Sequence, residues 1–72
     1  HSFYTGSFYA GGSATITGIT GFDPNDDTWA IDVLPISLHI TLTASAGQFT
    51  ITRSSADPST LQKFWRVILF RV

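Results

Sequence analysis

The segment Asp23–Asp27 holds the densest group of oxygen ligands in this sequence. Its residues, Asp-Pro-Asn-Asp-Asp, place carboxylate and amide oxygens at alternate positions, and such oxygens can converge on one calcium or magnesium ion. An EF-hand loop also needs glycine at its sixth position and glutamate at its twelfth, where this sequence has Thr28 and Leu34. The segment is therefore predicted to be a solvated turn. The alternative is a metal site, for which the candidate ligands are Asp23, Asn25 and Asp27.

His39 is the only histidine beyond the first residue, which restricts the chemistry that imidazole could supply. We expect a surface or hydrogen-bonded structural role for it, with a metal or anion site on a threefold axis as the alternative. A Ser-His-Asp triad would need an exposed serine, and the Gly-x-Ser-x-Gly turn that exposes one in hydrolases is absent. Paired carboxylates for glycoside cleavage are also not favoured, because three of the 5 acidic residues crowd into Asp23–Asp27. The sequence therefore predicts a protein that is not an enzyme and carries no cofactor.

Aromatic residues make up 14% of the chain, and their rings could stack on the C–H faces of a sugar. Packing in the core is the favoured role for these rings. The alternative is a small carbohydrate-binding, lectin-like module in which hydroxyl groups of the sugar are bound by polar side chains of the nearby loop. The candidate ligand-binding residues are Tyr4, Tyr9, Trp29, Asp23, Asn25 and Asp27.

The elements that must position these residues are predicted to be strands, because no long stretch repeats with a helical period. Residues 28–34 place Trp, Ile and Val on alternate positions. Ile36–Ala44 is the clearest strand, with Ile and Leu facing one way and Ser, His and Thr the other. A glycine turn at residues 45–47 then leads into Gln48–Ser54, which predicts a β-hairpin.

The predicted fold class is all-β: a small antiparallel sandwich, or an intertwined trimeric β-structure, with four to five strands per chain. We expect a single domain over residues 1–72 that is a fragment of a longer chain. A Ser-Phe-Tyr repeat recurs every five residues at the start, which is the period of neither a helix nor a strand, and glycines follow each copy. Residues 1–13 are therefore predicted to be an irregular aromatic and glycine-rich arm, and residues 14–72 the β domain.

The last ten residues, Lys63 to Val72, are apolar on both faces when read with a period of two. A strand that is apolar on both faces must be covered on both faces, and a chain of 72 residues can hardly supply both covers. We therefore expect identical neighbours to complete the fold. The predicted interface residues are Ile36, Leu38, Ile40, Leu42, Phe64, Trp65, Ile68 and Phe70.

Charged residues make up only 12% of the chain, and its formal net charge of −1 provides no positive field for a nucleic acid. The absence of cysteine excludes disulfides and thiolate metal sites, and no apolar run approaches the length of a membrane-spanning helix. Arg66 and Arg71 interrupt the apolar final strand. Each is expected to pair with an aspartate, Asp32 or Asp57, across a subunit boundary, because a buried unpaired charge is costly.

Three features resemble the C-terminal tip domains of bacteriophage tail fibres, tail spikes and similar trimeric viral adhesins. They are the Ser/Thr-rich alternation Ile36–Ala44, the hairpin strand Phe49–Arg53 and the aromatic final strand Phe64–Val72. The resemblance implies a viral structural protein, on the virion or extracellular, that forms a homotrimer and binds a cell-surface glycan or protein receptor. Neither nucleic acid nor a membrane span is expected. Exposed loops, here Phe22–Thr28 and Ser54–Thr60, would meet the host surface.

Overall fold

The computed structural model describes residues 2–72, and these residues form six strands and no helix. The prediction of an all-β chain is confirmed, although the number of strands is six rather than four or five. No helix in this part of the chain has the length and apolar character that crossing a membrane requires. The strands are β1 (Ser2–Phe8), β2 (Ser13–Ile16), β3 (Trp29–Leu34), β4 (Ile40–Ser45), β5 (Gln48–Arg53) and β6 (Lys63–Arg71).

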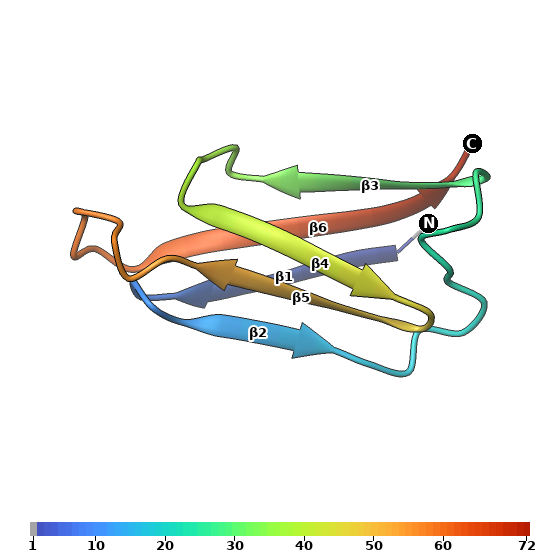
Figure 1. Cartoon of the computed structure of the whole chain (residues 1–72), viewed down its shortest axis with the longest axis horizontal. Coiled ribbons are helices and arrows are strands. Elements are labelled where there is room, and N and C mark those ends of the chain that lie inside the picture. Colours follow the sequence, from blue (N-terminus) through green and yellow to red (C-terminus); the bar gives the residue numbers. More distant parts are fainter. Residues whose placement is uncertain (1) are drawn as a thin grey trace.

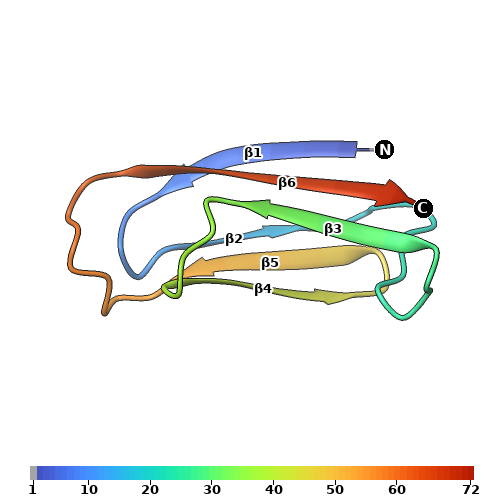
Figure 2. The ribbon, with the colours of Figure 1, turned by 90° about the horizontal axis from the view of Figure 1, so that it is seen from above.

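The strands form two antiparallel sheets of three strands each, which pack as a small sandwich (Figures 1 and 2). The first sheet has the order β1-β6-β3, and the second has the order β2-β5-β4. Only the β4–β5 hairpin joins neighbours within one sheet, so every other connection crosses from one sheet to the other. The last strand, β6, is consequently the centre of the first sheet.

The prediction of an irregular arm at residues 1–13 is wrong, because Ser2–Phe8 is a regular strand. It pairs with β6 along its whole length, from Ser2 opposite Leu69 to Phe8 opposite Lys63. The spacing of five residues between the two Phe-Tyr pairs does not exclude a strand. In a strand the two aromatics of one pair simply point to opposite sides of the sheet. Tyr4 and Phe8 both face the second sheet, whereas Phe3 faces away from it.

The core lies between the two sheets and follows a period of two in every strand. In β6 the buried side chains are Trp65, Val67 and Leu69, and in β5 they are Phe49 and Ile51. Tyr4 and Trp65 each meet the ring of Phe49 edge-on, at centroid distances of 5.4 and 6.4 Å. In β3, the alternating residues Trp29, Ile31 and Val33 of the predicted strand 28–34 all pack against this core.

The predicted strand Ile36–Ala44 begins later than expected, at Ile40. The Ser37 hydroxyl accepts a hydrogen bond from the backbone N–H of His39 at 3.1 Å, and Ile40 N donates to the Ser37 carbonyl at 3.2 Å. These local bonds close a turn and compete with strand pairing. As a result, Ile36 and Leu38 lie in the loop before β4, where they are 91% and 87% exposed.

Candidate interaction surface

The two sheets present very different outer faces to solvent. We call the side of the first sheet that points away from the core the apolar face. Residues directly opposite one another in a sheet point to the same side, so the strand register defines this face. Its side chains come from all three strands: Phe3, Thr5 and Ser7 of β1, Phe64, Arg66, Ile68 and Phe70 of β6, and Ala30, Asp32 and Leu34 of β3.

The apolar face exposes two large aromatic side chains. Phe64 is 79% exposed, and Phe3 is 60% exposed. A hollow of about 720 Å³ lies beside Phe64. It is lined by Thr5, Gly6, Ser7, Leu34, Pro35, Phe64, Trp65 and Arg66. The face therefore combines protruding rings with a depression that could receive one.

The apolar face carries one cation and one anion. Arg66 lies in the central strand opposite Leu34, and Asp32 lies in β3 opposite Ile68. Both side chains are exposed, and neither has a hydrogen bond or ion pair with any residue in the range 2–72. The expected pairing of Arg66 with Asp32 or Asp57 is thus not made within the chain.

The outer face of the second sheet, which we call the hydroxyl face, is polar. Thr15 and Thr43 lie on either side of Thr50, and Ser13 and Thr41 lie on either side of Thr52. The hydroxyl groups of Thr15 and Thr50 are hydrogen-bonded at 2.9 Å. The molecule therefore has one apolar face and one face covered with hydroxyl groups.

The predicted interface residues divide between three places. Phe64, Ile68 and Phe70 lie on the apolar face, and Ile36 and Leu38 lie in the exposed β3–β4 loop. The remaining three are corrected: Ile40 and Trp65 are buried in the chain's own core, and Leu42 packs against that core. The reason is the same in each case, because side chains between the two sheets are covered without help from a neighbour.

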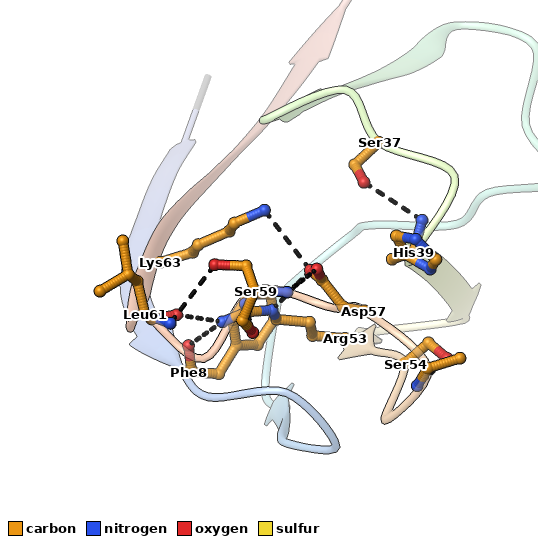
Figure 3. A network of polar contacts seen from close by, with 10 residues as sticks. Phe8, Ser37, His39, Arg53, Ser54, Asp57, Ser59, Leu61 and Lys63 are labelled. Atoms are coloured by element: carbon orange, nitrogen blue, oxygen red, sulfur yellow. Dashed lines mark hydrogen bonds and ion pairs between the residues drawn. The ribbon is translucent and has the colours of Figure 1, made fainter.

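Arg53 is the most thoroughly buried charged residue in the described chain, with no solvent exposure. Its guanidinium donates four hydrogen bonds (Figure 3). Nε donates to Asp57 Oδ2 at 2.9 Å, and the terminal nitrogens donate to backbone carbonyls. The carbonyl acceptors are Phe8 at 3.0 Å, Leu61 at 2.8 Å and Ser59 at 3.0 Å. Arg53 therefore joins the ends of β5 and β1 to the β5–β6 loop and is structural.

Asp57 completes this buried pair. Its Oδ1 accepts the backbone N–H of Ser59 at 3.0 Å, and Lys63 Nζ lies 3.4 Å from Oδ2. The Ser59 N–H, together with the side chains of Arg53 and Lys63, lowers the pKa of Asp57 to about 2. The aspartate predicted to pair with a neighbouring subunit is therefore used within its own chain. Its position four residues after Arg53 is the only sequence signal for the pair.

Two aspartates of the Asp23–Asp27 loop accept hydrogen bonds from residues close by in the sequence. Asp23 Oδ1 accepts the Asn25 N–H at 3.0 Å, and Asp26 Oδ1 accepts the Thr28 N–H at 3.0 Å. The Thr28 N–H and hydroxyl lower the pKa of Asp26 below its ordinary value, with a contribution from Arg71. This is the geometry of consecutive turns closed by aspartate side chains.

No group of three or more His, Asp or Glu side chains within residues 2–72 is arranged to hold a metal ion. His39 is half-buried in the loop before β4 rather than on a strand face, and its carbonyl accepts the Ser54 N–H at 2.7 Å. The residues named for the alternative metal sites are therefore found in structural hydrogen bonds or in turns.

The three aromatic residues predicted for sugar binding are not brought together. Tyr4 packs against Phe49 in the core. Trp29 donates its indole N–H to the Gly21 carbonyl at 3.2 Å and meets Phe22 edge-on at 5.4 Å. Tyr9 follows β1 at the other end of the sandwich from Trp29, so the rings form no common platform (Figure 1).

The two loops expected to meet a host surface lie at opposite ends of the molecule. The β2–β3 connection, which contains Phe22–Thr28, lies at the end with the two chain termini, whereas the β5–β6 loop lies at the other end (Figures 1 and 2). That other end also carries the β1–β2 and β3–β4 connections. Its exposed apolar side chains are Tyr9, Ile36, Leu38 and Leu61.

Comparison of the chain with protein-family models, with curated proteins and with solved structures gives no match.

Proposed function

We propose that this chain is a structural assembly module that associates with copies of itself through its apolar face. The observation that carries the proposal is the exposure of Phe64 and Phe3 on the side of the first sheet that also carries Ile68 and Phe70. Contiguous apolar patches of this kind mark interaction surfaces in soluble proteins. The rest of the chain supports an assembly role, since the charged groups outside this face are largely engaged in turns and buried pairs.

The resemblance to viral fibre and spike tips gives the module its place in a larger particle. There it would join copies of the parent protein on the virion or outside the cell, and the resemblance alone implies three copies. Attachment to a receptor would use loops at one end of the sandwich, because loops at opposite ends cannot meet one surface together. The end with Tyr9, Ile36, Leu38 and Leu61 is the more apolar of the two.

The proposal is tested by the mass of the native particle in solution. Sedimentation equilibrium of the wild-type chain between about 5 µM and 1 mM should show a mass above 7.8 kDa that rises with concentration. Phe70→Ala should weaken self-association about tenfold, because truncation of an aromatic side chain on the middle strand of the apolar face removes contact area from the interface. Leu61→Ala is the matched control, since Leu61 is 73% exposed but lies in the loop before β6 and is not part of the apolar face.

A wild-type chain that stays at the monomer mass over the whole concentration range would contradict the proposal. Equal effects of the Phe70 and Leu61 substitutions would show that the apolar face is not the contact. A lectin-like function is not favoured, because the rings that it requires lie apart.

A further inference from the structure

We infer that two copies of the chain pack apolar face to apolar face across a twofold axis that crosses β6 between Arg66 and Ile68. The inference rests on the proposed function and adds the partner's orientation and the residues that select it. Three observations support it: the difference between the two outer faces, the positions of the two charges, and the hollow beside Phe64.

The difference between the faces favours a symmetric pair over a ring of three. In such a ring each contact joins two different surfaces, whereas a twofold contact joins the same surface on both copies. The second broad surface of this molecule is the hydroxyl face, with Thr15, Thr43 and Thr50 in one row and Ser13, Thr41 and Thr52 in the next. It offers no apolar counterpart to the exposed rings of the first sheet. The surface that best matches the apolar face is therefore the same face of a second copy.

The charges select the direction of the axis. If the axis ran along β6, Arg66 would face Arg66 of the second copy, and like charges brought together in an interface are destabilising. If the axis runs across the strands between Arg66 and Ile68, the register places Asp32 of the second copy over Leu34, beside Arg66. Facing sheets are about 10 Å apart and neighbouring strands about 4.8 Å, so an arginine side chain can reach that carboxylate. Both charges of each copy are then neutralised.

The same axis matches the rings to the hollow. Phe64 and Phe70 lie at equal distances along β6 on either side of the axis, so Phe70 of one copy faces Phe64 of the other. The hollow of about 720 Å³ lies beside Phe64, between Leu34 and Ser7. Phe70 of the second copy therefore fills the depression, and offset rings of this kind attract one another.

The size of the face sets the expected strength. β6 has nine residues, so a sheet of three strands measures roughly 30 by 14 Å. Standard interfaces bury about 800 Å² per partner, whereas a face of these dimensions covers only roughly 420 Å², which is the size of a weak or transient contact. The dissociation constant is therefore expected to be micromolar or weaker, and the experiment must reach high protein concentrations.

Charge reversal tests the arrangement with two variants, Asp32→Arg and Arg66→Asp. Each variant alone places two like charges on the apolar face, and we expect its self-association to fall by about tenfold or more. An equimolar mixture should recover wild-type affinity, because a face with two cations then meets a face with two anions at both contacts. The two chains differ in mass, so native mass spectrometry identifies the mixed pair. The double variant Asp32→Arg/Arg66→Asp should also associate like the wild type.

The control is the pair Thr41→Arg and Thr52→Asp, whose positions are exposed on the hydroxyl face. Mixing these two chains should produce no preference for mixed pairs, although their charges are opposite. Circular dichroism checks that each variant is folded. If the wild type associates and Phe70→Ala weakens it, but mixing the Asp32 and Arg66 variants restores nothing, the twofold arrangement is overturned and the assembly proposal stands. A wild-type particle with the mass of three chains would also overturn the twofold arrangement and leave the assembly proposal standing.

Discussion

Arg53 illustrates how one residue can close one end of a small sandwich. It has the same strand parity as Phe49 and Ile51, so it points into the interior where a charge is costly. The cost is offset because its donors meet Asp57 and three backbone carbonyls. Those carbonyls belong to segments far apart in the sequence. Arg53 thereby fixes a loop that has no strand pairing of its own.

We predict that Arg53→Ala lowers the free energy of unfolding by about 3–5 kcal/mol, because it leaves Asp57 and the carbonyls without their buried donor. Urea denaturation followed by tryptophan fluorescence measures this change. Arg53→Lys should recover only part of the loss, since one ammonium group cannot reach all four acceptors. The matched control is Arg66→Ala, an exposed arginine, which should change stability by less than about 0.5 kcal/mol at a low protein concentration where copies do not associate.

The pair also predicts how stability depends on pH. The pKa of Asp57 is lowered from 3.8 to about 2 in the folded chain, so folding favours the ionised carboxylate. Its contribution is complete above pH 3.8 and is lost as the pH falls toward 2, because the unfolded chain then binds the proton more readily. Urea midpoints of the wild type should therefore fall as the pH is lowered through this window.

Asp57→Asn should remove much of this dependence while lowering stability at neutral pH. Asp27→Asn is the control, because Asp27 is exposed and lies in the β2–β3 connection, away from the buried pair. If the urea midpoint of Asp57→Asn falls with pH as steeply as that of the wild type, other carboxylates cause the loss of stability in acid.

At the scale of elements, the cross-strand pair of Gly6 and Trp65 lets the indole ring lie directly against the backbone of β1. A Cβ at Gly6 would lie 2.6 Å from Cζ2 of the Trp65 ring. The ring is positioned by packing alone, since its buried Nε1 has no hydrogen-bond partner within residues 2–72. Glycine is therefore required there for steric reasons, although its backbone conformation is that of an ordinary strand.

We predict that Gly6→Ala lowers the free energy of unfolding by about 1–3 kcal/mol, because the indole must move within a packed core. The tryptophan emission spectrum of the folded variant should shift as well. Thr5→Ala, one position away on the apolar face, is the control and should leave the spectrum unchanged. A Gly6→Ala variant with wild-type stability would show that the core accommodates the methyl group.

The elements that sequence alone predicts well are those whose side chains alternate cleanly. The positions of β3 and the β4–β5 hairpin follow within a few residues, because their apolar residues repeat with a period of two, and β6 is marked by apolar residues on both of its faces. Such patterning does not reveal β1, because Thr5 and Gly6 interrupt its apolar positions. Nor does it reveal the start of β4, because the turn at Ser37 depends on hydrogen bonds that apolar patterning does not encode.

At the scale of the whole molecule, the sequence indicates that β6 needs a cover on both sides, but not which cover is internal. Both faces of β6 contain large apolar residues, and only the position of the second sheet shows that Trp65, Val67 and Leu69 are the inner set. The candidate surface can therefore be identified only once it is known which of the two apolar faces of β6 the second sheet covers. Asp32 and Arg66 can be connected with it only through the register of β3 against β6.

The order of strands in the first sheet has a consequence for how the chain is made. Among these strands β1 leaves the ribosome first and β3 follows later, yet neither can pair within its sheet until β6 emerges and enters between them. The β4–β5 hairpin and β2, by contrast, can already assemble on the nascent chain. The first sheet can therefore form only after β6, the last of the six described strands, has been synthesised.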